Sequence, residues 1–162
     1  MANKSNKNSN QSSQKMPVPL ASLPAVLLPW YDREKRSLPW RDIVTPYRTW
    51  VSEIMLQQTR VQAVLPYFER FMSAAPDVPA LAELAEDRLL SLWQGLGYYS
   101  RARSLQRSAR VMVDQYGGCL PDTYSDLIQL PGIGDYTAGA ILSIAFNKAV
   151  PAVDGNVLRI EA

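Results

Sequence analysis

The sequence predicts an all-α protein built from short helices. Apolar residues recur at three- and four-residue steps in segments 50–68, 81–93 and 105–113, the spacing that gives a helix one buried face. Proline and glycine interrupt the chain between these segments, so each helix is expected to end early. The alternating pattern of a strand is scarce, and the extended stretch 149–153 is too short to found a sheet.

Length and composition set the scale of that fold. With 162 residues, 47% of them apolar, the chain can form one well-packed core. Residues 1–18 form a polar head dominated by Asn, Ser, Gln and Lys, and we expect them to be disordered because they bury almost nothing. No apolar run approaches the ~20 residues of a membrane span, and the head lacks the apolar stretch of a secretory signal. We therefore expect a soluble intracellular protein.

Two helices are predicted on either side of a tight turn at 130–135. Pro121, Asp122 and Thr123 are typical of a helix start with a capping residue, so the first helix is expected over 124–130. The second is expected over 136–146. The pattern predicts a helix–turn–helix hairpin.

The turn of this hairpin has the features of a phosphate site. Gly132 and Gly134 lack side chains, so their backbone N–H groups can come close to an anion. The helix that begins near Asp135 adds the positive end of its dipole. We predict that the hairpin binds phosphate.

The net charge of +2 does not by itself indicate a nucleic-acid partner. Such an indication would have to come from a local patch, and the stretch 98–113 contains four arginines and no acidic residue. The arginines are Arg101, Arg103, Arg107 and Arg110. This group is either a surface that neutralises several phosphates or an ordinary solvated helix face.

Five short sequence motifs indicate a protein family. They are LPWR at 38–41, SEIMLQQT at 52–59, LWQGLGYYSRAR at 92–103, LPGIGDYTAGAI at 130–141 and VDGN at 153–156. In this order and spacing they resemble the adenine DNA glycosylases of the MutY type, within the helix-hairpin-helix base-excision glycosylases. The likeness runs from about residue 20 to the end of the chain, so it covers nearly everything except the polar head.

The resemblance implies the helix-hairpin-helix DNA glycosylase fold. A six-helix barrel domain is expected over 46–150, with the hairpin at 124–146. Residues 19–45 are expected to form an N-terminal helix and a strap that contribute to a second lobe. Residues 151–162 would then form the aspartate loop and the start of that lobe, which is incomplete here.

The resemblance also implies an activity. Such a protein hydrolyses the N-glycosidic bond of adenine mispaired with 8-oxoguanine or guanine, without cutting the strand, in base excision repair. Its partner is double-stranded DNA carrying that mispair. We expect a monomer that acts in the nucleoid or the nucleus.

A [4Fe-4S] cluster held by four cysteines is the cofactor that the resemblance implies. Cys119 is the single cysteine of this sequence, so neither a disulfide nor a cysteine-held metal site can form within it, and no metal ligand is assigned. The chain ends at Ala162 inside what resembles a starting helix, with no stop signal. We expect an incomplete protein that is weakly active at best.

The sequence contains no histidine, so acid–base chemistry falls to carboxylates, tyrosine or lysine. Glu53 lies in the mostly apolar stretch 50–56, where loss of solvation would raise the pKa of a carboxyl toward the ~6–7 that suits a general acid. By resemblance it matches the glutamate that protonates adenine and helps to position water. The alternative is that Glu53 faces solvent or pairs with Arg48 or Arg60.

The second carboxylate is Asp154, to which the resemblance assigns the stabilisation of the sugar cation. An ordinary helix N-cap is the simpler interpretation, and both can hold because a cap fixes the side chain. Asn156 matches the asparagine of the family's aspartate loop and is expected to hydrogen-bond in the site.

Tyr136 occupies the position at which strand-cutting relatives, such as those like endonuclease III, carry a nucleophilic lysine. A phenol cannot form the Schiff base that the lyase step requires. A monofunctional glycosylase is therefore expected.

The target nucleotide must leave the duplex before it can react. Gln58 and Tyr98 match positions at which the family inserts side chains into the base stack. One of Tyr98 and Tyr99 is expected to pack in the core instead. The other DNA or substrate contacts implied are Trp40, Arg41 and Leu56 at the adenine pocket, and Gln57, Thr59, Gly132, Gly134, Asp135 and Thr137 along the DNA.

Two alternatives remain open at this point. One is a bifunctional glycosylase and lyase like endonuclease III, which Tyr136 disfavours. The other is a helix-hairpin-helix module that binds DNA through backbone phosphates without catalysis.

Overall fold

The computed structural model describes residues 22–161, which fold into helices joined by turns, with no strand among them. The predicted all-α class is confirmed. The head at 1–18, expected to be disordered, lies outside the described residues. None of the described helices is long and apolar enough to cross a bilayer. The helices are α1 Leu23–Glu34, α2 Pro39–Asp42, α3 Pro46–Leu56, α4 Val61–Ala74, α5 Val78–Glu83, α6 Glu86–Trp93, α7 Tyr99–Tyr116, α8 Tyr124–Leu127, α9 Asp135–Ala145 and α10 Gly155–Glu161.

The described residues divide into two compact units, 22–36 and 37–161. The described part of the first unit is helix α1 with its flanking residues, and this helix has a proline in its first turn and Pro29 in its interior. Its side chains are largely exposed, Trp30 among them. The second unit contains the predicted site residues.

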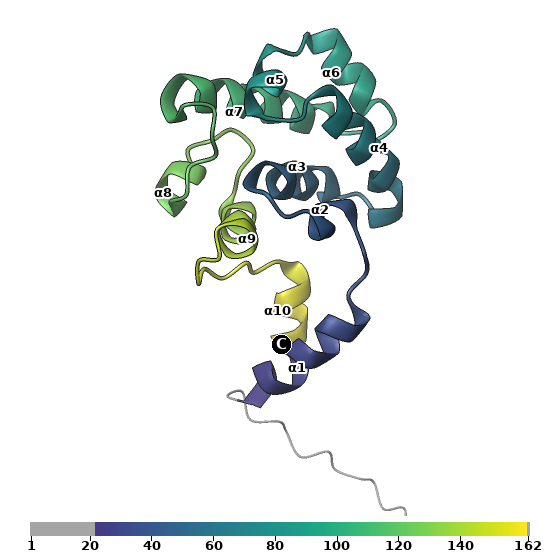
Figure 1. Cartoon of the computed structure of the whole chain (residues 1–162), viewed down its shortest axis with the longest axis vertical. Coiled ribbons are helices and arrows are strands. Elements are labelled where there is room, and N and C mark those ends of the chain that lie inside the picture. The colour runs from purple at the N-terminus through teal and green to yellow at the C-terminus, as the bar shows by residue number, and fades with distance from the viewer. Residues whose placement is uncertain (1–21, 162) are drawn as a thin grey trace, which may run out of the picture. The chain divides into compact units, whose positions relative to one another are not determined.

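Helix α3 is the central helix of the second unit (Figure 1), and it contacts α2, α4, α7 and α9. Three of its side chains, Trp50, Val51 and Met55, are fully buried. Phe71 of α4 and Trp93 of α6 pack edge to face, with their ring centroids 6.1 Å apart. One hydrophobic core therefore runs through this unit, and α3 lies inside it.

Side-chain caps determine where several of these helices begin. Thr45 Oγ1 accepts a hydrogen bond from the backbone N–H of Arg48 at 3.2 Å, and Pro46 follows as the first residue of α3. Asp77 caps α5 in the same way, through the backbone N–H of Ala80 at 2.9 Å. These local signals set the register of α3, and with it the position of Glu53.

The hairpin is formed by α8 and α9, but its first helix is shorter than predicted. Thr123 is the N-cap, as expected, and accepts from the backbone N–H of Asp126 at 3.2 Å. From Gln129 on, the backbone N–H groups bond to carbonyls three residues back rather than four, which tightens the last turn. The expected helix over 124–130 was therefore too long by three residues.

The loop before Asp154 lies directly against α9 at Gly139. A Cβ atom at this position would be only 2.2 Å from the carbonyl oxygen of Pro151. Glycine is unfavourable inside a helix by about 1 kcal/mol relative to alanine, so close backbone approach explains its presence here. The contact places the loop that carries Asp154 on the surface of α9.

We predict that Gly139→Ala destabilises the protein by about 1–3 kcal/mol, because the new methyl group must displace the backbone of Pro151. In a domain of this size that loss lowers Tm by about 2–4 °C for each kcal/mol. Gly155→Ala is the control, since no atom lies within 4 Å of the Cβ it would add. An unchanged or higher Tm for Gly139→Ala would contradict the proposed contact.

Candidate functional site

The packing of α3 against α9 brings Glu53 and Tyr136 together. The Glu53 side chain is half-buried, and burial is the largest effect that raises the pKa of its carboxyl. A hydrogen bond with the Tyr136 side chain and the positive charge of Arg41 lower this pKa, whereas the negative charge of Asp154 raises it further. Three predicted site residues, Tyr136, Arg41 and Asp154, therefore lie close enough to Glu53 to change the pKa of its carboxyl.

Asp154 is held at the start of α10 by three hydrogen bonds. Its Oδ1 accepts the backbone N–H groups of Asn156 at 2.9 Å and Val157 at 3.0 Å. Its Oδ2 accepts the side-chain amide of Asn156 at 2.7 Å. The Val157 bond is the largest effect that lowers the pKa of Asp154, so the carboxyl stays ionised at neutral pH. Asp154 is thus a helix cap with a fixed side chain.

Tyr136 interacts with both carboxyls. Burial, with the charges of Glu53 and then Asp154, raises the pKa of its phenol to about 12. The hydroxyl therefore keeps its proton at neutral pH and remains a hydrogen-bond donor. The side chain is 39% exposed, so this position is open to solvent.

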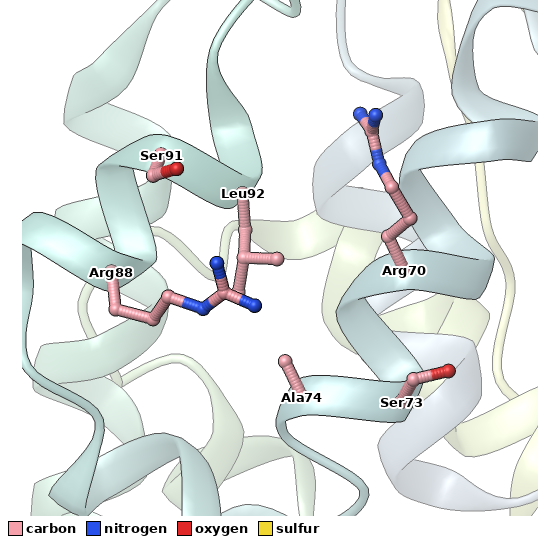
Figure 2. Close-up of a pocket in the computed structure, with 6 residues that line it drawn as sticks. All are labelled: Arg70, Ser73, Ala74, Arg88, Ser91 and Leu92. Atoms are coloured by element: carbon pink, nitrogen blue, oxygen red, sulfur yellow. The ribbon is translucent and has the colours of Figure 1, made fainter.

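A cavity of about 480 Å³ lies beside Tyr136 and the loop that leads to Asp154. Its lining residues are Tyr124, Asp135, Tyr136, Val150, Pro151 and Val153. A second cavity of about 420 Å³ lies between α4 and α6, where Arg70 and Arg88 line it together with two serines (Figure 2). None of the predicted site residues lines this second cavity.

The hairpin turn is exposed at Gly132 and Gly134, as a phosphate site requires. Asp135 accepts a hydrogen bond from the hydroxyl of Tyr124 at 2.8 Å, a partner that the sequence did not indicate. The side chain of Thr137 is only 3% exposed and faces the core, and its expected contact with DNA stays a prediction. Its position in the first turn of α9 explains the burial, because that face of the helix is buried.

Gln58 and Tyr98, the two predicted wedge residues, share an unusual backbone conformation. Their φ angles are 58° and 50°, in the left-handed region that residues other than glycine rarely adopt. Both are exposed, Tyr98 by 64%. The expectation that one tyrosine of the pair packs in the core was wrong, because Tyr99 is also exposed, by 39%.

The residues expected at the adenine pocket lie in different environments. Trp40 is 6% exposed and packs edge to face on Phe68, with 5.1 Å between ring centroids. Leu56 is half-buried at the end of α3. Arg41 is exposed, and its positive charge lowers the pKa of Glu53. Of these residues, Arg41 is therefore the one that acts on the predicted acid.

The arginines of α7 do not form one phosphate-facing surface. The guanidinium of Arg101 turns inward and bonds to carbonyl oxygens, including those of Ile54 at 3.0 Å and Gly97 at 3.2 Å. Arg103 pairs with Glu86 at 2.8 Å on the surface. For Arg101, neither alternative left open by the sequence holds, because its guanidinium forms part of neither a phosphate-neutralising surface nor a solvated helix face.

The residues of this chain do not fit a four-cysteine cluster. Cys119 is the one cysteine in the sequence, and it is exposed and unpaired. Within residues 22–161, no group of three or more His, Cys, Asp or Glu side chains could hold a metal ion. No metal ligand is therefore assigned to this part of the chain.

Comparisons with known proteins place the chain in a family. The profile of a family described as "HhH-GPD superfamily base excision DNA repair protein" matches residues 51–161. The chain is 50% identical over 143 residues to an adenine DNA glycosylase of Mus musculus, and 44% identical over 135 residues to one of Buchnera aphidicola subsp. Baizongia pistaciae. It also superposes on a solved thermostable thymine-DNA glycosylase with a TM-score of 0.81, at 27% identity, covering 86% of this chain and 65% of that one.

The two sequence matches cover 83% of this chain but only 28% of the mouse protein and 38% of the Buchnera protein. The chain therefore spans well under half the length of these curated relatives.

We predict that Glu53→Gln stabilises the protein at neutral pH. A raised pKa means that ionised Glu53 costs folding free energy. That cost is fully present above the folded-state pKa and disappears below the unfolded-state value. The gain in Tm should therefore be seen at pH 7.5 and vanish near pH 4, with about 2–4 °C for each kcal/mol.

Glu83→Gln, at an exposed position of α5, is the matched control and should show no such dependence. A Glu53→Gln variant that is less stable than the wild type at pH 7.5 would show that burial does not disfavour the Glu53 carboxylate.

Proposed function

Because this chain belongs to the HhH-GPD superfamily of base excision DNA repair proteins, we propose that it carries the catalytic site of a monofunctional adenine DNA glycosylase. The substrate is double-stranded DNA with adenine opposite 8-oxoguanine or guanine. The relatives named adenine DNA glycosylase support the choice of base.

The observation that carries the proposal is that the surroundings of Glu53 and Asp154 shift the pKa values of the two carboxyls in opposite directions. Burial raises the pKa of Glu53, while hydrogen bonds lower that of Asp154. In a pair of this kind, the carboxyl with the raised pKa suits the role of proton donor and the carboxyl with the lowered pKa suits the role of anion. Hydrolysis of a glycosidic bond requires these two roles.

In the proposed reaction Glu53 donates its proton to a ring nitrogen of adenine. The bond between C1′ and the base breaks, and its electron pair leaves with the base. Positive charge develops on the deoxyribose, where ionised Asp154 stabilises it. Water then adds to C1′ and returns a proton to the Glu53 carboxylate, which leaves free adenine and an abasic site.

Tyr136 and Asn156 orient the two acids in this scheme. The phenol of Tyr136 hydrogen-bonds Glu53, and the amide of Asn156 holds Asp154 at 2.7 Å. Neither group needs to change its protonation state during the reaction. Both therefore act as positioning residues.

DNA engagement is assigned to the exposed turns of the second unit. The hairpin at Gly132 and Gly134 presents backbone N–H groups to a phosphate. Gln58 and Tyr98 enter the base stack and hold open the gap left by the extruded adenine. Trp40, Arg41, Leu56, Gln57 and Thr59 contribute to the base pocket and the adjoining strand.

The wider setting follows from the same family. We propose that the protein acts as a monomer on chromosomal DNA, in the nucleoid or the nucleus. A [4Fe-4S] cluster would need four cysteines, and this sequence contains one. Any cluster would thus be held by residues outside these 162.

Three other functions are distinguishable from this one. A bifunctional enzyme like endonuclease III would need an amine where the Tyr136 phenol stands. A thymine glycosylase is a candidate because the solved thymine-DNA glycosylase shares the fold at 27% identity. A non-catalytic hairpin module would make no use of the two opposed carboxyls.

We predict that Glu53→Gln and Asp154→Asn each lower adenine release by about 10²–10⁴-fold, because each removes one charge or proton that the transition state needs. Asparagine is itself a good helix cap, so Asp154→Asn should keep the local fold. The measurement is the single-turnover rate of adenine release from a duplex with adenine opposite 8-oxoguanine. The Kd for the same duplex is measured alongside it.

Glu83→Gln, outside the site, should release adenine like the wild type. Release of thymine from a thymine–guanine mispair, with adenine left in place, would favour the thymine glycosylase. Tight binding without release of either base would favour the non-catalytic module.

We predict that the wild-type protein leaves the DNA strand intact until alkali or heat is applied, because Tyr136 offers no amine for a Schiff base. Borohydride should trap no covalent complex between the protein and DNA. Alkali-treated samples serve as the control, since they break at every abasic site. Strand scission as fast as base release would require a different nucleophile.

A further inference from the structure

We infer that Arg101 is a positioning residue that holds the two DNA wedges, Gln58 and Tyr98, at a fixed separation. The inference rests on the proposed function, because it assumes that these side chains enter the base stack. According to this inference, the inward-facing guanidinium of Arg101 holds both wedge residues in position before DNA binds.

Arg101 bonds to the end of α3 and to the turn that carries Gln58. Its Nη1 donates to the carbonyls of Ile54 at 3.0 Å, Met55 at 3.1 Å and Gln57. The first two are among the last carbonyls of α3, which have no partner within the helix. Its Nη2 donates to Thr59 Oγ1 at 3.3 Å. The residues on both sides of Gln58 are therefore tied to this one side chain.

The same guanidinium bonds to the turn that carries Tyr98. Nη2 donates to the carbonyls of Leu96 at 3.3 Å and Gly97 at 3.2 Å. The guanidinium also lies over the Tyr98 ring, 5.4 Å from its centroid, which is within the range of a cation–π contact. Arg101 thus joins two turns that are some forty residues apart in sequence.

The two turns need such a support because both are strained. Gln58 and Tyr98 are among the few non-glycine residues of the described chain with a positive φ, at 58° and 50°. Such conformations persist only where the surroundings determine them, and they cluster at functional sites. The bonds from Arg101 supply those surroundings on both sides of the wedge.

The positive charge of Arg101 is compensated by carbonyl oxygens rather than by a carboxylate. Within residues 22–161, no carboxylate lies at ion-pair distance from it. Its guanidinium is instead compensated by carbonyl oxygens, at the negative end of the α3 dipole. The two Nη groups of the planar fork are what allow one side chain to serve both turns, while the buried Nε has no hydrogen-bond partner, and lysine cannot reproduce the fork.

The test measures extrusion of the base separately from cleavage. A duplex carries 2-aminopurine at the target position, and its fluorescence rises when the base leaves the stack. Glu53→Gln is present in every sample, so that the base is not removed during the measurement. We expect Arg101→Met to lower the extruded population by about 10- to 100-fold, the range that follows from losing hydrogen bonds to a charged group. Arg101→Lys should give an intermediate value.

A second arm separates positioning from a general structural role, with intact Glu53. Adenine release by Arg101→Met should fall by a similar factor on a fully paired duplex, but by less than about threefold on adenine in an unpaired bubble, which is already unstacked. The pH profile of release should not move. Arg88→Met, which removes one charge from a cavity apart from the site, should match the wild type in both arms.

Thr59→Val tests the same link if Arg101→Met does not fold, because it removes one acceptor of the guanidinium and keeps the charge. It should lower extrusion by a few-fold. Unchanged extrusion in Thr59→Val and in a folded Arg101 variant would overturn the inference, and so would an equal loss of release on paired and unpaired DNA. No fluorescence rise with Glu53→Gln alone would also overturn it, whereas a rise without adenine release by the wild type would refute the proposed chemistry only.

Discussion

The close packing of α9 against α3 is the constraint on which the candidate site depends. It brings the phenol of Tyr136 to the carboxyl of Glu53, although the two residues are 83 positions apart in sequence. Gly139 then admits the Pro151 carbonyl to the surface of α9, and the loop delivers Asp154 to the same place. A side chain at 139, or a shift of α9, would separate the two carboxyls without touching either.

The carboxyls of Asp154 and Glu53 differ in pKa because their surroundings differ. Only the ionised form of Glu53 lowers the stability of the fold. Asp154 gains three hydrogen bonds at the start of α10, which stabilise both its charge and the helix. Glu53 is half-buried in α3 beside the core residues Trp50 and Ile54, where its charge is disfavoured. A carboxyl whose charge opposes folding is common at catalytic positions.

Local signals predicted much of this molecule. The Thr123 cap and the two glycines of the hairpin turn depend on neighbours in sequence, and the structure has them where expected. The burial of Thr137 and the inward turn of Arg101 depend on packing between distant segments, which no local pattern encodes. The sequence pattern also did not predict that α8 ends at Leu127. Glu53, Tyr136 and Asp154 were found through a family resemblance. Their interaction through space became visible only with the fold.

A titration of the Glu53 carboxyl by 13C NMR, assigned through its loss in Glu53→Gln, tests the central claim most directly. We expect a pKa above the usual 4.5. That pKa should fall in Asp154→Asn, which removes a nearby negative charge, and rise in Tyr136→Phe, which removes a hydrogen bond to the carboxylate. An ordinary value that neither substitution moves would mean that the three side chains do not share a site.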